Sequence, residues 1–370
     1  MNLHYVPVMA AKRGEFTALS NLSASISKKT VPLFELPAKS KSLEKGISRT
    51  ASDAGKAWHD RVAFLDISKW SPNARTESGI HVLEYALSQF RSNSIETHPV
   101  VGYDRWDDPT YSQALTNIRR HFPTVTPCIR FDRETIQDDM PDTAYFSERT
   151  QEILDSLDLD PSNCFAMLDF GDVSTSSVPQ VISDTEMAIE TLRSIGFDSV
   201  IVVGGSMPTA VNEAVDTPDA EGCIPRIEMM AWKAVFSDWA DKKIIFGDYL
   251  IRSPIAAEGV IALHANAKLR YTIDNQYFIV RGHSKQIDPL TMQHKELAKK
   301  LVASPYYMGS SFSWGDTTIL NCSIGATEIR DATLMIAVDS NHHISFVVAE
   351  IFEHQKQVVS TTTARTKQLE

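Results

Sequence analysis

The sequence predicts a (β/α)8 barrel, and two observations carry this prediction. Eight short apolar runs recur along the chain, each closed by a charged residue or a glycine. The segments between them are long enough for a helix, and several have helical periodicity. This alternation is typical of a barrel whose functional site is built from the residues that follow the strands. The predicted strands are Tyr5–Ala10, Val31–Leu36, Val62–Ile67, Pro99–Asp104, Pro127–Asp132, Phe165–Asp172, Ser199–Gly205 and Lys243–Tyr249.

Seven helices are predicted between these strands. The third is the clearest, because Ile80, Leu83, Leu87 and Phe90 recur at spacings of three and four. The sixth is expected to end at Gly196, a favourable C-terminal cap. The predicted ranges are about 15–22, 51–60, 80–90, 110–122, 143–157, 181–195 and 226–240, with a long loop at 212–225 before the last.

The strand–helix alternation stops after Ile251, which suggests a second unit. We therefore predict a barrel at residues 1–252, an appended α+β unit at 253–354 that packs on it, and a polar flexible tail at 355–370. Within the appended unit we expect a hairpin at 269–280, helices at 289–302 and 316–323, and an ambiguous segment at 331–352 for which helix is favoured.

Composition excludes several classes of protein. The formal net charge of −11, without a basic run, disfavours binding to nucleic acid. No stretch approaches the 18 apolar residues of a membrane span, and no signal peptide is apparent. The four cysteines form no close pair, so we expect free thiols and a cytoplasmic protein.

Charged residues close seven of the eight predicted strands, so the barrel mouth is the predicted site. Glu35, Asp66 and Asp169 interrupt apolar runs and are the candidate catalytic carboxylates, suited to acid–base work. Together they could also hold Mg²⁺. The alternative is that such a carboxylate is a structural partner of Arg130.

The other candidate residues predict recognition of an anion. Arginines suit phosphate or carboxylate, and backbone amides after the seventh strand often bind phosphate in barrels, although a plain tight turn is equally compatible with the two glycines there. The candidate ligand-binding residues are Lys12, Arg13, Asp104, Arg130, Gly205, Ser206, Asp248, Arg281 and His283. Arg281 and His283 follow the predicted hairpin and would reach the mouth from the appended unit. His342 and His343 are adjacent and favour a structural role over metal binding.

Short motifs at both ends of the chain resemble the Beta protein family. The opening Tyr5-Val6-Pro7-Val8 through Phe16, followed by Val31-Pro32-Leu33-Phe34-Glu35, carries the first part of the resemblance. Phe312-Ser313-Trp314-Gly315-Asp316 and Asn341-His342-His343-Ile344 carry the second. The family is named after a protein of a T-even bacteriophage and has no established biochemical activity. Its occurrence in phages and bacteria implies a connection with phage–host conflict.

Two functions are therefore expected as alternatives. The first is a barrel that binds a small anionic, phosphorylated or similar molecule and acts as a metal-dependent hydrolase or phosphodiesterase. The second is a non-catalytic ligand sensor or partner-binding protein of anti-phage defence, with a protein partner encoded nearby. Tightly bound metal would favour the first, and a stable complex without metal the second.

Overall fold

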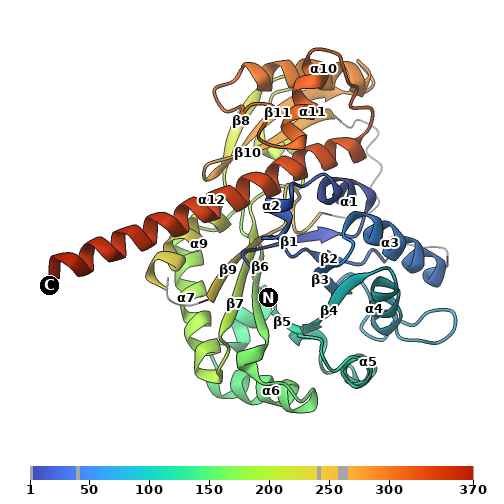
Figure 1. The fold of residues 1–370 in the computed structure, drawn as a ribbon, viewed down its shortest axis with the longest axis vertical. Coiled ribbons are helices and arrows are strands. Elements are labelled where there is room, and N and C mark those ends of the chain that lie inside the picture. The colour runs from blue at the N-terminus through green and yellow to red at the C-terminus, as the bar shows by residue number, and fades with distance from the viewer. Residues whose placement is uncertain (1–2, 39–41, 240–242, 257–265, 370) are drawn as a thin grey trace.

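The computed structural model describes residues 3–38, 42–239, 243–256 and 266–369, with side chains through residue 360. Parallel strands close into a barrel in the order β1-β2-β3-β4-β5-β6-β7-β9, which confirms the predicted fold (Figure 1). The barrel strands are β1 (Tyr5–Ala10), β2 (Leu33–Glu35), β3 (Arg61–Asp66), β4 (Ile95–Gly102), β5 (Cys128–Phe131), β6 (Phe165–Asp172), β7 (Ser199–Gly205) and β9 (Lys243–Asp248).

Helices follow the strands as the periodicity predicts, and most differ by a few residues at their ends. The second differs more, because it spans Leu43–Ala57 and not the predicted 51–60. The third predicted helix begins at Val82 rather than Ile80, because the side chain of His81 caps it by accepting from the Leu83 amide. Gly196 ends the sixth in the left-handed conformation, as expected. The helices around the barrel are α1 (Arg13–Ser20), α2 (Ala24–Ser27), α3 (Leu43–Ala57), α4 (Val82–Ser92), α5 (Pro109–His121), α6 (Thr143–Ser156), α7 (Val178–Ile195) and α9 (Ile227–Asp238), with short turns η1 (Tyr103–Arg105), η2 (Thr135–Asp139) and η3 (Pro161–Asn163).

The interior of the barrel is a packed apolar core and not a channel. Because side chains alternate along a strand, every second residue of each strand points inward. The inward positions from the N-terminal end to the middle of the barrel are apolar, and they form one cluster of buried residues. Val6, Val8, Leu33, Phe64, Val100, Cys128, Phe165, Met167, Ile201, Val203 and Ile245 belong to this cluster.

A second sheet forms the appended unit. Its three strands pair antiparallel in the order β10-β11-β8, and β8 comes from the segment 212–225 that was predicted to be a loop. The predicted loop is therefore an excursion from the barrel that supplies a strand to the other unit. The elements of this unit are α8 (Val211–Ala214), β8 (Glu221–Pro225), β10 (Asn266–Ile273), β11 (Gln276–Ser284), α10 (Leu290–Ala303) and α11 (Trp314–Ser323). Residues 257–265, which the predicted unit includes, lie outside the described residues.

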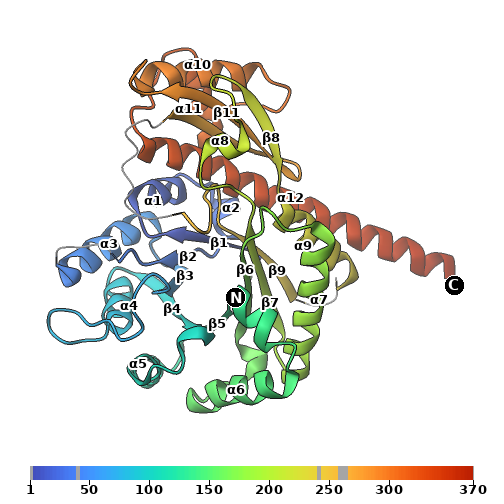
Figure 2. The same cartoon turned by 180° about the vertical axis from the view of Figure 1, so that it is seen from behind.

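Helix α12 (Ala332–Leu369) belongs to both units and crosses between them (Figures 1 and 2). Met335 and Val338 lie in the core of the appended unit, whereas Ile344 and Ile351 lie in the core between the barrel strands and their helices. The helix packs on α1, and Lys233 of α9 forms an ion pair with Glu350. Residues beyond 252 thus supply the last helix of the barrel, between the final strand and the first.

The C-terminal segment differs from its prediction. The polar composition of residues 355–370 predicts a flexible tail, but α12 continues through Leu369 and extends away from the body of the protein (Figure 1). None of the described helices, this long one included, combines the length and the apolar character that a membrane crossing requires.

Candidate functional site

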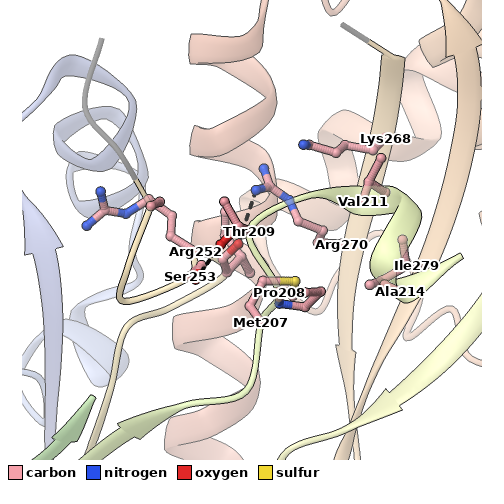
Figure 3. A pocket seen from close by; sticks show the side chains of 12 residues that line it. Met207, Pro208, Thr209, Val211, Ala214, Arg252, Ser253, Lys268, Arg270 and Ile279 are labelled. Atoms are coloured by element: carbon pink, nitrogen blue, oxygen red, sulfur yellow. Dashed lines mark hydrogen bonds between the residues drawn. The ribbon is translucent and has the colours of Figure 1, made fainter. Parts of the chain in front are cut away.

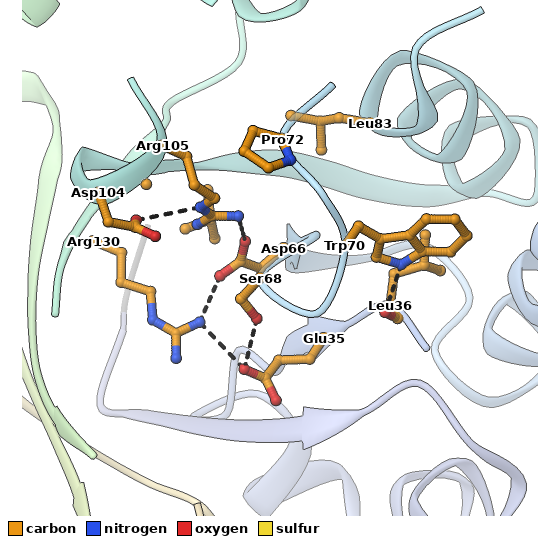
Figure 4. A network of polar contacts seen from close by, with 12 residues as sticks. Glu35, Leu36, Asp66, Ser68, Trp70, Pro72, Leu83, Asp104, Arg105 and Arg130 are labelled. Carbon is orange, nitrogen blue, oxygen red and sulfur yellow. Dashed lines mark hydrogen bonds and ion pairs between the residues drawn. The ribbon is translucent and has the colours of Figure 1, made fainter. Parts of the chain in front are cut away.

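Charged side chains gather at the C-terminal end of the barrel, and Figure 4 shows Glu35, Asp66 and Arg130 among them. On several strands the inward position two residues after an apolar one is charged, and the alternation of side chains therefore directs these charges toward one another. Leu33 is followed in this way by Glu35, Phe64 by Asp66, Cys128 by Arg130 and Met167 by Asp169. The structure brings these four predicted residues together in one network, here called the mouth network.

Arg130 is the centre of the mouth network. Its guanidinium group contacts Asp66 at 2.5 Å, Asp169 at 2.5 Å and Glu35 at 3.3 Å. The hydroxyl of Tyr249 accepts from Arg130 at 2.8 Å and donates to Asp169 at 2.6 Å. These ion pairs agree with the alternative prediction from the sequence, in which the carboxylates are structural partners of Arg130.

Arg105 gives Asp66 a second cation. The two side chains lie 2.9 Å apart, and Arg105 also contacts Asp104 at 3.3 Å. Burial alone would raise the pKa of Asp66, but the charges of Arg105 and Arg130 outweigh it and hold the pKa below its ordinary value. Four carboxylates face two guanidinium groups here, so the mouth network carries two excess negative charges. It is therefore a poor environment for an anion.

Arg130 also occupies the space between the three candidate carboxylates, where the predicted Mg²⁺ would lie. The described residues include no group of three or more His, Cys, Asp or Glu side chains arranged to hold a metal ion.

Asp248 closes the last strand but points away from the mouth network. Phe246 packs in the outer core and the inward position falls on Tyr249, so Asp248 faces α12. It accepts hydrogen bonds from Tyr5 at 2.6 Å and pairs with His343 at 2.9 Å. This predicted ligand residue therefore joins the barrel to the appended unit.

The remaining candidates near the barrel are dispersed. Lys12 precedes α1 on the surface, and Arg13 lines a separate groove between α1 and α3. Gly205 is the last residue of β7 and packs against the ring of Pro254. A Cβ atom at this position would lie only 2.9 Å from that ring, which explains the glycine. Ser206 donates to the buried Glu228 and accepts from the amide of Ile227. Gly205 and Ser206 therefore determine the conformation of the loop after β7.

A cavity of about 100 Å³ opens beside these loops, between the barrel and the appended sheet (Figure 3). It has room for several waters or one oxyanion. The loops after β7 and β9 form one wall, and β10, β11 and α8 form the other. The lining residues are Met207, Pro208, Thr209, Val211, Ala214, Ile251, Arg252, Ser253, Ala256, Lys268, Arg270 and Ile279.

Cations are concentrated on the wall formed by the appended sheet. In β10 the residues Leu269 and Tyr271 enter the appended core, so Lys268 and Arg270 face the barrel. Arg281 of β11 lies directly opposite Lys268 in the antiparallel register and shares its face. Like charges opposite each other destabilise a sheet. An anion between the sheet and the barrel would relieve this repulsion.

Only part of this positive charge is neutralised. Arg270 pairs with the buried Asp339 at 3.0 Å, and Arg252 lies 3.6 Å from Glu15. Arg281 donates to the carbonyls of Val215 and Asp216, which carry no formal charge. The side chain of Lys268 makes no hydrogen bond or ion pair with the described part of the chain, although the more distant charge of Asp339 acts on it.

The same surroundings shift two pKa values at the cavity. Burial raises the pKa of Asp339 to about 6, although Arg270 opposes this effect. Burial, together with the charge of Arg270, lowers the pKa of Lys268 to about 8. The three lining cations Arg252, Lys268 and Arg270 therefore face two carboxylates, Glu15 and Asp339, which leaves about one excess positive charge at neutral pH. Arg281, which was predicted to contact the ligand, lies on the same face of the sheet but does not line the cavity.

Sequence reasoning missed Arg252, Lys268 and Arg270 because they follow or lie outside the predicted strand ends. The available signal was the alternation of Lys268 and Arg270 with apolar residues at the start of the predicted hairpin, which begins one residue after Lys268. His283, in contrast, was predicted at the mouth, but it lies between Asp219 and Asp288 at the end of β11 and does not line the cavity.

The two histidines of the C-terminal motif are fully buried and fix the junction of the units. His342 contacts Asp316 at 3.0 Å and stacks on Tyr271. His343 contacts Thr272 at 2.7 Å and Asp248 at 2.9 Å, and its burial lowers its pKa. The two C-terminal motifs therefore meet, in keeping with the predicted structural role of the histidines.

Comparison with known proteins identifies the relatives of the chain without assigning an activity. The model of the Beta protein family matches residues 5–349. No curated protein matches. Among solved structures, 2,3-dimethylmalate lyase, a member of the PEP mutase/isocitrate lyase superfamily, is similar at 10% identity and a TM-score of 0.34, over 70% of this chain and 78% of the lyase. This likeness is too distant to inform the chemistry.

Proposed function

This chain belongs to the Beta protein family, and we propose that it binds a small anionic molecule at the C-terminal end of its barrel. The binding site is the cavity between the loops after β7 and β9 and the cationic face of the appended sheet. The observation that carries the proposal is Lys268, a half-buried cation that faces this cavity and whose amino group makes no ion pair or hydrogen bond with the described residues.

Three further features support an anion there. Arg270 and Arg281 lie on the same face of the sheet as Lys268. Arg270 forms an ion pair with one carboxylate, that of Asp339, and Arg281 donates to the uncharged carbonyl of Val215. The hydroxyls of Thr209 and Ser253 line the opposite wall and can donate to oxygen atoms. Loops after the seventh and eighth strands of a barrel are also the usual position of its phosphate sites.

Both alternatives predicted from the sequence use such a site. A hydrolase or phosphodiesterase would act on the bound anion, and a sensor in phage–host conflict would transmit its presence to a protein partner. The geometry favours binding over acid–base catalysis, because Arg130 holds the three candidate carboxylates in ion pairs. Their catalytic use, and Mg²⁺ as a cofactor, stay predictions.

Calorimetric titration with sulfate tests the binding role, since sulfate is a small oxyanion of constant charge. Wild-type protein is expected to bind it. Lys268→Met should weaken binding by about tenfold or more, the loss of one charged hydrogen bond. Arg252→Gln should weaken it less, because the side chain of Arg252 points away from Lys268 and Arg270 (Figure 3) and lies 3.6 Å from Glu15.

Two exposed residues of the appended unit provide matched controls. Lys299→Met and Arg330→Gln remove the same charges from surface ion pairs and should leave sulfate affinity unchanged. Equal affinity in wild type and Lys268→Met would contradict the proposed site, and so would equal losses in Lys268→Met and Lys299→Met.

A further inference from the structure

The ε-amino group of Lys268 has the surroundings of a nucleophile. It projects from β10 into the cavity on the same side as Arg270 (Figure 3). The described residues give it no hydrogen bond and no ion pair. The hydroxyls of Thr209 and Ser253 lie across the cavity and leave the amine accessible to a small molecule.

The protonation state of this amine suits a reaction. Burial and the neighbouring Arg270 lower its pKa to about 8. At pH 7 roughly one molecule in ten would then carry a neutral amine, against fewer than about one in a thousand for an ordinary lysine. Only the neutral amine has the lone pair that attacks a carbonyl carbon.

We propose that Lys268 condenses with the carbonyl group of a small oxo acid, an aldehyde or ketone that also carries a carboxylate, and forms an imine in the cavity. The inference rests on the proposed anion site, because the carboxylate takes the place of the anion beside Arg270. Arg270 and Lys268 are two residues apart on one face of β10, so one small molecule can contact both.

The condensation is balanced without an oxidant or reductant. The ammonium group first releases a proton to water. The nitrogen lone pair then forms a bond to the carbonyl carbon as the C=O π bond breaks onto oxygen, and a proton passes from the nitrogen to that oxygen, which gives a carbinolamine. A proton from water converts its hydroxyl to a leaving water molecule while the nitrogen lone pair forms the C=N bond, and the resulting iminium returns a proton to water, which gives the imine.

Reductive trapping tests the inference on the full chain. Wild-type protein is incubated with glyoxylate and cyanoborohydride, which reduces an imine to a stable carboxymethyl amine, and labelled lysines are mapped by peptide mass spectrometry. Lys268 should be labelled on the order of tenfold faster than the exposed Lys299 in the same sample. Because both lysines are compared in one wild-type sample, no variant has to fold. Equal rates would overturn the proposal.

Acetaldehyde in place of glyoxylate tests the need for a carboxylate. The preference for Lys268 should fall sharply with this neutral aldehyde, and added sulfate should slow the labelling by glyoxylate. An undiminished preference with acetaldehyde would overturn the assignment to oxo acids. Sulfate calorimetry separates the two levels: sulfate binding without preferential labelling defeats this inference alone, whereas absence of both defeats the proposed function as well.

Discussion

The mouth network and the cavity lie at the same end of the barrel but differ in the balance of their charges. In the mouth network Arg130 contacts three carboxylates, and the cluster has an excess of negative charge. In the cavity Lys268 lacks a partner among the described residues, and the excess is positive. Charged strand ends can therefore be structural, while the proposed anion site lies where the two units meet.

The largest expected effect concerns the stability of the mouth network. Arg130→Met leaves Glu35, Asp66 and Asp169 buried with less counter-charge, and should lower the free energy of unfolding by about 3–5 kcal/mol. Urea unfolding at neutral pH measures this. Arg330→Met, which breaks an exposed ion pair, should cost at most about 1 kcal/mol. Similar losses in the free energy of unfolding for both variants would show that the mouth network contributes no more to stability than an exposed ion pair.

Anion affinity should depend on pH through the cavity alone. As pH rises through about 6, Asp339 ionises and adds a negative charge beside Arg270. As pH rises through about 8, Lys268 loses its positive charge. Each step should weaken sulfate binding by about 1.5 kcal/mol, or about tenfold. Calorimetry from pH 5 to 9 measures both steps, and Lys268→Met should lack the upper one; affinity that rises with pH would contradict the account.

Tyr249 sharpens the interpretation of the mouth network. Its hydroxyl bridges Arg130 and Asp169, and Tyr249→Phe should lower the free energy of unfolding by about 1 kcal/mol without altering sulfate affinity. Chemical unfolding and calorimetry on the same preparation measure the two quantities. A variant that loses sulfate binding but keeps its stability would place the ligand at the mouth network instead.

The smallest effect is expected for the stability of a cavity variant. Lys268→Met should change the free energy of unfolding by less than about 0.5 kcal/mol, because the side chain has no described partner and its charge opposes Arg281. Thermal unfolding provides the comparison. A large destabilisation would mean that Lys268 supports the fold. Weaker sulfate binding by the Lys268→Met variant would then no longer be evidence for the proposed site.

The barrel could be predicted from the sequence because its strands coincide with short apolar runs, and its helices show apolar residues at helical spacing. The sequence also located Glu35, Asp66, Arg130 and Asp169, since all four occupy inward positions that continue the alternation of their strands. Asp248 was predicted with them, but at the end of β9 the inward position falls on Tyr249, one residue later. The side chain of Asp248 therefore points outward, toward His343. Orientation at a strand end depends on neighbouring strands, which local patterns do not encode.

The cavity was beyond sequence reasoning for a different reason. Lys268, Arg252 and Thr209 lie in three separate segments, and only the docking of the appended sheet on the barrel brings them together. That docking uses β8, which was predicted as loop, and α12, which serves both cores. Long-range arrangements of this kind depend on packing between units, and a single sequence gives no direct signal for them.

The most direct test of the central claim is a crystal structure of the protein soaked with tungstate, a heavy oxyanion whose anomalous signal gives its position. The account predicts a tungsten peak in the cavity, within contact of Lys268 and Arg270, and its loss in Lys268→Met crystals. A peak only in the groove of Arg13, Arg49 and Lys56, or against Arg130 in the mouth network, would contradict it.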